Sequence, residues 1–240
     1  MITSPRERRR RDSLRQFSQA HLVALAVLVV TATAPVLAAR RHPGDWMPVW
    51  SVALACVIAA SWVGEYVIAA ARGTWSAEYG LLLQLTDAVS AVAVLALLTR
   101  RALLVELLYF WSLTASLQAL LTPDLGETFP NVYYFTYFGY HIGAVAAASF
   151  LVFGWRLYPR AGAMWRVLAV TLAFAAVAAV ANLLTGGNYM YLRAKPVHNS
   201  LLNVIGPWPW YIAATVVLAV PMLLVLQLLA DTLRERERVA

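Results

Sequence analysis

Seven long apolar runs, separated by short polar segments, dominate this chain. A helix needs about 20 mostly apolar residues to cross roughly 30 Å of hydrocarbon, and each run is close to that length. The pattern predicts an all-α fold, a polytopic membrane bundle of seven transmembrane helices. The predicted helices span residues 21–39, 49–71, 79–98, 102–121, 132–155, 164–184 and 208–230.

The composition agrees with a membrane protein. Of the 240 residues, 61% are hydrophobic and only 13% are charged, whereas soluble domains carry about 25% charged residues. Seven helices use most of the chain, so we expect a single membrane domain over residues 20–232. A basic tail at 1–19 precedes it and a charged tail at 233–240 follows it. We expect the first helix to be retained, because its exit is a weak context for signal-peptide cleavage.

The net charge of +7 comes from arginines near the ends of the predicted helices. Basic residues at such positions contact lipid headgroups, so we expect phospholipid or other acyl-lipid partners and no nucleic acid. The single cysteine, Cys56, excludes an intrachain disulfide and a cysteine-based metal cluster. No His or acidic spacing resembles a hydrolytic metal site. We therefore expect no metal and no cofactor, while the oligomeric state stays open.

Lysines and arginines are divided almost equally between the two membrane faces, so the positive-inside rule does not decide the orientation. The loops counted without the tails favour an external N-terminus, whereas the basic run at residues 6–15 resists translocation. We therefore predict a multi-pass protein of the cell membrane with a cytoplasmic N-terminus, which puts the C-terminus of seven spans outside.

Polar side chains within the predicted helices gather near the membrane face on which the N-terminus lies, here called the N-terminal face. Counted along its helix, Asp87 is about 11 Å below this face. A polar group in hydrocarbon must be paired or line a wet cavity, because burying it unsatisfied costs several kcal/mol. We predict a pocket here; the alternative is a hydrogen-bond network that only holds the helices together. The residues of this layer are Glu65, Gln84, Thr86, Asp87, Gln118, His141 and Asn182.

Two carboxylates and one imidazole in one layer favour chemistry over helix packing. A hydroxyl on one helix and an imidazole on another are the minimum parts of a nucleophile and its general base. His141 is the natural base, because it is the only histidine inside predicted helices two to seven. Asp87 or Glu65 is placed to orient its ring.

The loop over residues 185–207 is rich in Gly, Pro and aromatic residues. Long ordered loops in compact proteins tend to be functional, so we expect this one to fold over the polar layer as a lid. Asn188 and Lys195 would then meet a lipid phosphate or carboxylate. The alternative for Trp208 and Trp210, just beyond the loop, is an aromatic belt at the membrane interface.

Several motifs in the second half of the chain resemble the YwaF-type integral membrane family of bacteria. The resemblance implies a distant similarity to the animal transmembrane protein 164 group, membrane acyltransferases that pass fatty acyl chains between phospholipids through a cysteine. More remotely, it implies similarity to androgen-induced membrane hydrolases of fatty acid esters, which use a threonine and a histidine. The motifs are Leu121-Thr122-Pro123-Asp124-Leu125, Phe129-Pro130, His141, Asn188-Tyr189-Met190-Tyr191-Leu192, Lys195-Pro196, Ser200-Leu201-Leu202 and Gly206-Pro207-Trp208-Pro209-Trp210-Tyr211.

One stretch departs from the family pattern. Where the family commonly has Leu-Pro-Leu-His-Leu-Cys, residues 81–86 read Leu-Leu-Leu-Gln-Leu-Thr. Gln84 thus replaces the histidine and Thr86 replaces the cysteine. A hydroxyl needs base activation that a thiol does not, so the alternative is that the chemistry has been lost in this chain.

Together these observations predict a membrane-embedded lipid acyltransferase or lipid-ester hydrolase. Thr86 would attack an acyl carbonyl, His141 would take and return the proton, and Asp87 or Glu65 would hold the histidine. Gln84 or Asn188 would donate to the oxyanion. The expected substrate-binding residues are Gln84, Gln118, Asp124, Tyr137, Asn182, Asn188, Tyr189, Lys195, Trp208 and Trp210.

Two alternative hypotheses assign the same residues to a non-catalytic function. In one, the protein is a carrier or receptor that binds lipid or another small molecule in the pocket. No internal repeat or second polar region supports a transport route. In the other, the protein is a scaffold whose polar layer fixes helix register.

Overall fold

The computed structural model describes residues 14–196, 202 and 204–239. Most of the predicted basic tail and the Ser200-Leu201 pair of the loop motif lie outside the described residues. The described chain is helical and contains no strand. Its elements are α2 (Gln19–Arg41), α3 (Trp46–Ala71), α4 (Leu85–Thr99), α5 (Ala102–Trp111), the π-helix η1 (Ser112–Ser116), α6 (Leu117–Leu121), α7 (Val132–Ser149), the π-helix η2 (Phe150–Gly154), α8 (Ala163–Thr185), the 3-10 turn η3 (Tyr189–Tyr191) and α9 (Trp210–Val239).

Six helices of the described chain are long and apolar enough to cross a membrane. They span Gln19–Arg41, Trp46–Ala71, Ala102–Leu121, Val132–Gly154, Ala163–Thr185 and Trp210–Val239. The expected third span is shorter than predicted, because α4 has only 15 residues and begins at Leu85. A multi-pass helical protein is therefore confirmed, whereas the count of seven full-length spans is not.

The late start of α4 has a local cause. The amide of Leu81 donates to the hydroxyl of Tyr189 at 2.8 Å, so it is committed to another segment and not to a helical turn. The amide of Gln84 donates to Oδ2 of Asp87 at 3.0 Å, which closes the first turn at this point. Apolar residues 79–83 therefore form a loop, although their hydropathy matches that of a helix.

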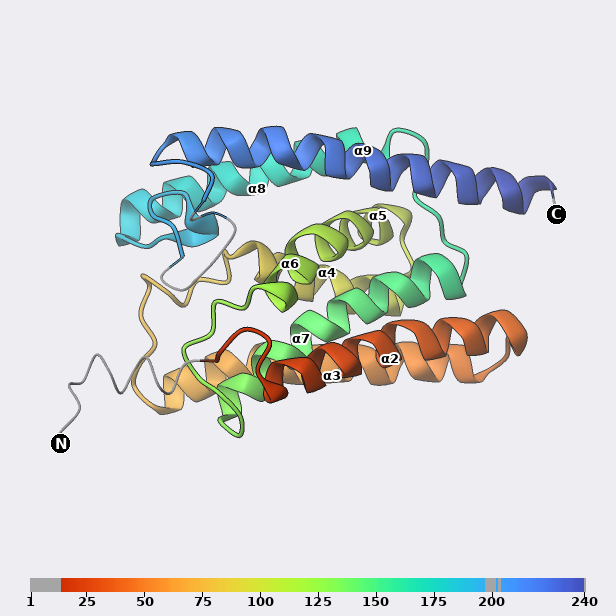
Figure 1. Ribbon diagram of the computed structural model, residues 1–240, viewed down its shortest axis with the longest axis horizontal. Helices are drawn as coiled ribbons and strands as arrows, with labels where there is room; N and C mark the ends of the chain where they lie inside the picture. Colours follow the sequence, from red (N-terminus) through yellow and green to blue (C-terminus); the bar gives the residue numbers. More distant parts are fainter. Residues whose placement is uncertain (1–13, 197–201, 203, 240) are drawn as a thin grey trace.

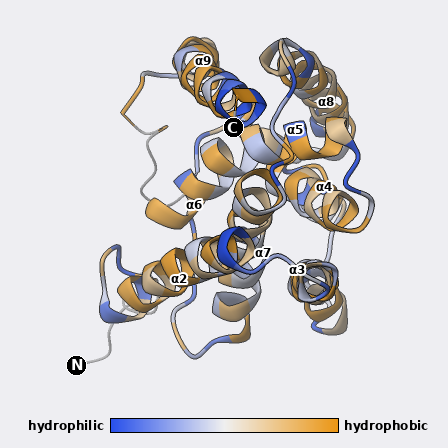
Figure 2. Cartoon of the chain, turned by 90° about the vertical axis from the view of Figure 1, so that its right-hand side faces the viewer, coloured by the Kyte–Doolittle hydropathy of each residue, from blue (hydrophilic) through white to orange (hydrophobic). Residues whose placement is uncertain are grey.

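The helices run roughly parallel to one long axis (Figure 1), with α8 and α9 on one side of the bundle and α2 and α3 on the other, where they pack against α7 from two sides (Figure 2). α7 lies between these layers, and 83% of its apolar window is buried, against 11–17% for α2, α3, α8 and α9. The outer helices expose apolar side chains, and their ribbons are largely in the orange of hydrophobic residues in Figure 2. An outer surface made of apolar side chains is what a lipid environment requires.

Small residues let α3 approach α7 closely. A Cβ atom added to Gly143 would lie 2.5 Å from Cγ1 of Ile58, and one added to Gly139 would collide with Ser61. Such close backbone approach is the usual way membrane helices gain packing contacts without a hydrophobic driving force between them. Glycine at these two positions of α7 thus determines how α3, which carries Glu65, meets α7, which carries His141.

The last helix continues past the expected boundary. α9 is helical to Val239, so residues 233–239 of the predicted charged tail extend the helix. Glu237 accepts hydrogen bonds from Arg40 at 2.7 Å and from Arg156 at 3.0 Å. These ion pairs tie the end of α9 to α2 and to the loop after η2.

Candidate functional site

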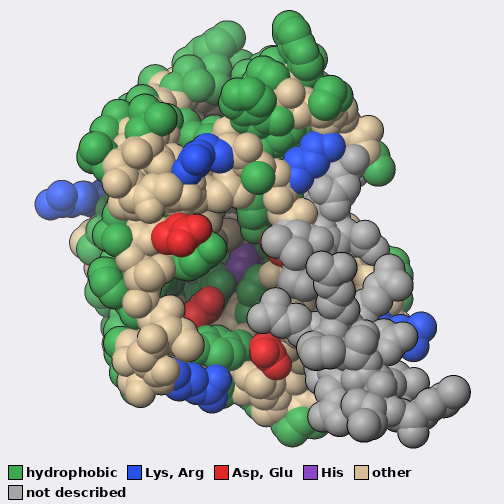
Figure 3. Space-filling model, turned by 90° about the vertical axis from the view of Figure 1, so that its left-hand side faces the viewer, with side chains coloured by type: hydrophobic (Ala, Val, Ile, Leu, Met, Phe, Trp, Pro, Cys, Tyr) green, Lys and Arg blue, Asp and Glu red, His purple; other side chains and the backbone are tan. Residues whose placement is uncertain are grey.

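A cavity of about 230 Å³ opens at the N-terminal face, between α3, α4, α7 and the loop joining α3 to α4. In the space-filling view of this end, the surface is hollowed, with acidic side chains around the hollow and a histidine side chain visible inside it (Figure 3). Thr86, Asp87, Glu65 and Gln84, all predicted from the sequence, contribute to the cavity wall. The lining residues are Glu65, Tyr66, Ala69, Thr74, Trp75, Ser76, Tyr79, Gly80, Gln84, Thr86, Asp87, Tyr133 and Tyr140.

Asp87 is the most heavily hydrogen-bonded side chain of the cavity. Its Oδ1 accepts from Nε1 of Trp62 at 2.9 Å and from the hydroxyl of Tyr66 at 2.6 Å. Its Oδ2 accepts from the backbone of Gln84 at 3.0 Å. A carboxylate with three donors is held rigidly and links α3 to the start of α4. None of the hydrogen bonds described for Asp87 comes from His141, which was expected to be its partner.

Glu65 faces the same cavity with a different environment. Its Oε2 is buried and has no hydrogen-bond partner among the described residues. A buried acceptor without a donor costs free energy, so such a group in a cavity wall is a marker for a ligand or a proton. Glu65 therefore keeps one oxygen without a donor, whereas both oxygens of Asp87 accept hydrogen bonds.

Thr86 lies in the first turn of α4 and is half-buried. This placement corrects the predicted depth, because the six residues that precede Leu85 are loop and not helix. The first two bonded amides of α4, those of Asp87 and Ala88, donate to the carbonyl of Gln84. Within the described chain the amides of Leu85 and Thr86 have no partner, as is usual at the start of a helix. The Thr86 hydroxyl thus sits beside unpaired amide donors.

His141 lies one layer behind the cavity. The side chain is buried, with 2% of its surface exposed, and its ring is 4.3 Å from the Tyr137 ring and 4.4 Å from the Tyr140 ring. Its Nδ1 is 2.8 Å from the carbonyl oxygen of Tyr137. A carbonyl only accepts, so Nδ1 carries the proton and Nε2 is the basic nitrogen. Tyr140 lines the cavity, whereas His141 is not among the lining residues.

A much larger apolar groove, of about 780 Å³, runs between α2, α3 and α7. Its wall contains no Asp, Glu, Lys, Arg or His, and its one threonine hydroxyl, that of Thr31, donates to the Val27 carbonyl of the same helix. The groove offers room for hydrocarbon but no carboxylate or imidazole to activate a hydroxyl. The smaller polar cavity is therefore the candidate site.

A model of the TMEM164 family matches residues 16–227, which is most of the chain. The chain belongs to the TMEM164 family. No curated protein and no solved structure matches it.

In this TMEM164-family chain the loop after α8 packs against the loop before α4. The backbone amide of Tyr189 donates to Asn182 at 2.6 Å, and Asn182 donates back to the Tyr189 carbonyl at 3.0 Å. The buried Tyr189 hydroxyl donates to the Ala77 carbonyl and accepts from the amide of Leu81, both at 2.8 Å. Asn182 and Tyr189 thus support the cavity wall from behind.

Gln84 also serves this contact. Its side-chain oxygen accepts from the amide of Met190 at 2.8 Å, so the oxygen faces the loop. Where the expected family pattern has a histidine, this chain has an amide that joins two loops. The unpaired amides at the start of α4 are further candidate donors to an oxyanion, beside the side-chain amide of Gln84.

The remaining predicted substrate residues lie farther along the same face. Asn188 accepts from the amides of Arg193 and Ala194 and so folds its own loop. Tyr191 donates to Asp124 at 2.9 Å, and burial, followed by the Asp124 charge, raises the pKa of Tyr191. The other positions are Tyr137, bonded to the Ala119 carbonyl, Gln118, bonded to Thr122, Lys195, placed over the Tyr211 ring, and the exposed Trp208 and Trp210.

Sequence reasoning missed the aromatic part of the cavity. Tyr66 and Trp62 hold Asp87, while Tyr133 and Tyr140 line the wall from α7. A signal was available, because residues 62 and 66, and likewise 133 and 140, share one helix face. Among the described residues no group of three or more His, Cys, Asp or Glu could hold a metal ion.

Proposed function

We propose that this protein is a membrane-embedded lipid acyltransferase or lipid-ester hydrolase that works at the polar cavity of the N-terminal face. The observation that carries the proposal is that one cavity wall holds a threonine hydroxyl at a helix start and a carboxylate oxygen with no partner. Membership of the TMEM164 family supports it. The finer likeness to the YwaF-type bacterial group is part of the proposal.

Thr86 is the nucleophile of the proposed reaction. Its Oγ1 forms an ester bond to the acyl carbon of a phospholipid while the bond from that carbon to the lipid oxygen breaks. A base takes the Thr86 proton and returns it to the departing lysolipid oxygen. In the second step the hydroxyl of another lysolipid, or water in the hydrolase, takes the acyl group and restores the threonine.

Two groups compete for the role of base. His141 presents Nε2 as its basic nitrogen, and movement of Tyr140 would open its way to the cavity. Glu65 already lines the cavity with an unpartnered oxygen. The amides of Leu85 and Thr86 would stabilise the oxyanion, because helix N-termini favour negative charge.

The test is mass-spectrometric lipid analysis of the purified protein in vesicles that contain phospholipid and isotope-labelled lysophospholipid. Wild-type protein is expected to form labelled diacyl lipid or release fatty acid. Thr86→Ala is expected to lower turnover by on the order of a thousandfold or more, and Thr86→Ser to retain part of it. Thr99→Ala, which removes a threonine hydroxyl at the other end of α4, is the matched control.

The base is assigned by separate variants. Loss of a general base costs about a hundredfold to ten-thousandfold, so His141→Gln and Glu65→Gln should differ by that much. If a folded wild-type protein turns over no lipid in a broad panel, or Thr86→Ala keeps full turnover, the catalytic assignment is wrong. The cavity then binds lipid or another small molecule without chemistry, or holds helices together as Asp87 does.

Location and orientation are part of the proposal. We place the protein in the cell membrane with a cytoplasmic N-terminus, so the cavity opens toward the cytoplasmic side. Cysteine labelling from each side of intact cells, at a residue introduced in the loop between α3 and α4, tests this orientation.

A further inference from the structure

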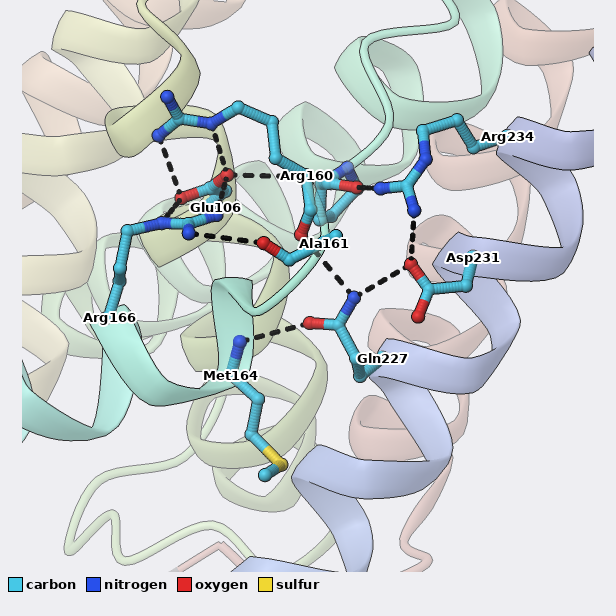
Figure 4. Close-up of polar contacts among 9 residues, drawn as sticks. Glu106, Arg160, Ala161, Met164, Arg166, Gln227, Asp231 and Arg234 are labelled. Atoms are coloured by element: carbon cyan, nitrogen blue, oxygen red, sulfur yellow. Dashed lines mark hydrogen bonds and ion pairs between the residues drawn. The ribbon is translucent and has the colours of Figure 1, made fainter. Parts of the chain in front are cut away.

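A second charged cluster lies at the other end of the bundle, on the membrane face opposite the cavity, here called the opposite face. Its centre is Glu106 of α5, whose side chain is only 1% exposed. Figure 4 shows the Glu106 carboxylate between the guanidinium groups of Arg160 and Arg166. Arg160 donates from Nε at 2.8 Å and from Nη2 at 3.2 Å, and Arg166 donates from Nε at 2.9 Å and from Nη2 at 2.8 Å. The Arg160 amide adds a fifth donor.

One carboxylate cannot neutralise two guanidinium groups. The Arg160 side chain is 55% exposed and the Arg166 side chain is 38% exposed. Both use one edge of the guanidinium for Glu106, and Nη1 of Arg160 makes no hydrogen bond within the described chain. The cluster therefore presents net positive charge and free N–H donors to the surroundings.

Neighbouring groups hold this cluster in place. Gln227 of α9 accepts from the Met164 amide at 3.0 Å and donates to Asp231 at 3.0 Å. Arg234 donates to Asp231 and to the Pro159 carbonyl, which closes the network drawn in Figure 4. Arg160 and Arg166 also flank the N-terminus of α8, whose positive dipole end adds to their charge.

The wider charge distribution points the same way. At the N-terminal face the described residues carry about as many acids as bases, whereas the opposite face is rich in arginine. Figure 2 views the bundle from the opposite face, with hydrophilic residues at the helix ends that face the viewer. The basic residues there are Arg40, Arg41, Arg100, Arg101, Arg156, Arg160, Arg166, Arg234, Arg236 and Arg238, and the acidic ones are Asp45, Glu106, Asp231, Glu235 and Glu237.

The surface next to the cluster is suited to hydrocarbon. Trp165, beside Arg166, is 63% exposed, as tryptophans at the level of lipid headgroups are. Farther along α8, Leu172 and Val177 are 53% and 56% exposed. A ligand at the arginines would thus have its charged end at the membrane border and an apolar helix surface below it.

We propose that Arg160 and Arg166 form a binding site for the phosphate of an anionic phospholipid on the opposite face. Guanidinium forks match the geometry of phosphate oxygens, and each guanidinium is already oriented by Glu106. The apolar surface of α8 favours a lipid over free phosphate, because it gives the acyl tails a place to lie. The site is independent of the proposed acyl chemistry, which lies at the other membrane face.

The experiment uses the full-length protein in bilayers and spin-labelled lipids. It measures the association of labelled phosphatidylglycerol relative to labelled phosphatidylcholine. Wild-type protein is expected to prefer phosphatidylglycerol, and Arg160→Gln is expected to reduce that preference about fivefold, the equivalent of about 1 kcal/mol per basic residue near the surface. Arg72→Gln removes one arginine at the N-terminal face and is expected to leave the preference unchanged.

Arg160→Gln leaves Glu106 with fewer donors and could therefore act through misfolding, so a second variant is needed to distinguish the two effects. Glu106→Gln raises the local charge by one unit and is expected to strengthen the preference for phosphatidylglycerol, an outcome that unfolding does not produce. The site would be overturned if Arg72→Gln reduced the preference for phosphatidylglycerol as much as Arg160→Gln does. It would also be overturned if the preference did not change in Arg160→Gln or in Glu106→Gln. Displacement of labelled phosphatidylglycerol by inorganic phosphate alone would overturn the lipid assignment in favour of a soluble anion.

Discussion

Replacing Asp87 tests whether this carboxylate holds the cavity together. It accepts three hydrogen bonds, two from α3 side chains and one from the backbone of Gln84. Interhelical hydrogen bonds in membrane proteins average about 0.6 kcal/mol and reach about 1.7 kcal/mol. Loss of a helix cap costs about 1 kcal/mol. Asp87→Ala is therefore expected to lower the free energy of unfolding by about 2 to 4 kcal/mol.

A milder substitution at the same position tests one of the three hydrogen bonds separately. In Asp87→Asn the side-chain oxygen still accepts from Trp62 and Tyr66, but the amide nitrogen faces the N–H of Gln84 as a second donor. Only the third bond is lost, so we expect a destabilisation of about 1 kcal/mol.

The assay is reversible unfolding of the purified protein in mixed micelles, followed by tryptophan fluorescence and circular dichroism. Asp45→Ala is the matched control, because Asp45 also stands at a helix start but is exposed and makes no side-chain cap bond. We expect its effect to stay within about 0.5 kcal/mol. If Asp87→Ala matches the control, or if Asp87→Asn is the more damaging variant, the assigned hydrogen bonds do not support the fold.

Three further predictions concern packing and the loops. Gly143→Ala places a methyl 2.5 Å from an α3 side-chain carbon and is expected to cost about 1 to 3 kcal/mol, whereas Gly44→Ala, with its nearest atom at 3.8 Å, should be tolerated in the same unfolding assay. Tyr189→Phe removes a buried hydroxyl that makes two hydrogen bonds to the loop before α4. We expect the free energy of unfolding to fall by about 1 to 3 kcal/mol and the backbone amides of that loop to exchange hydrogen faster. Unchanged exchange would contradict this prediction. Burial and then Asp124 raise the pKa of Tyr191 in the folded state, so its contribution to stability is complete below the unfolded pKa of about 10 and falls as pH rises above it. Stability of Tyr191→Phe should accordingly fall less steeply over that alkaline range, and identical slopes would refute the assignment.

The apolar pattern determined much of the fold, because hydropathy and length are local properties of each segment. The predicted helices over residues 21–39, 102–121 and 164–184 agree with the described ones to within two residues at each end. Six candidate spans follow from the same property. Hydropathy failed at residues 79–84, where the chain is apolar but its amides are committed to Tyr189 and Asp87. Non-local hydrogen bonds of this kind leave no trace in a hydropathy pattern.

Only part of the candidate site could be predicted from the sequence. Residue type and depth marked Glu65, Thr86 and Asp87, and these three do line one cavity. The sequence did not distinguish the two carboxylates, because the difference lies in their donors: α3 supplies two to Asp87, while Oε2 of Glu65 has none among the described residues. His141 was expected in the same polar layer, but it is not part of the cavity wall, to which α7 contributes Tyr133 and Tyr140.

Charge pairing shows the same division between sequence and tertiary structure. In the sequence, Glu106 is an isolated acid in an apolar segment. Its partners Arg160 and Arg166 lie more than fifty residues farther along the chain. Sequence alone therefore determined which segments are helices and which side chains are costly to bury in lipid. Only the packing of the helices decided which of those side chains is paired, because the donors that satisfy a buried charge come from segments that are distant along the chain and close in space.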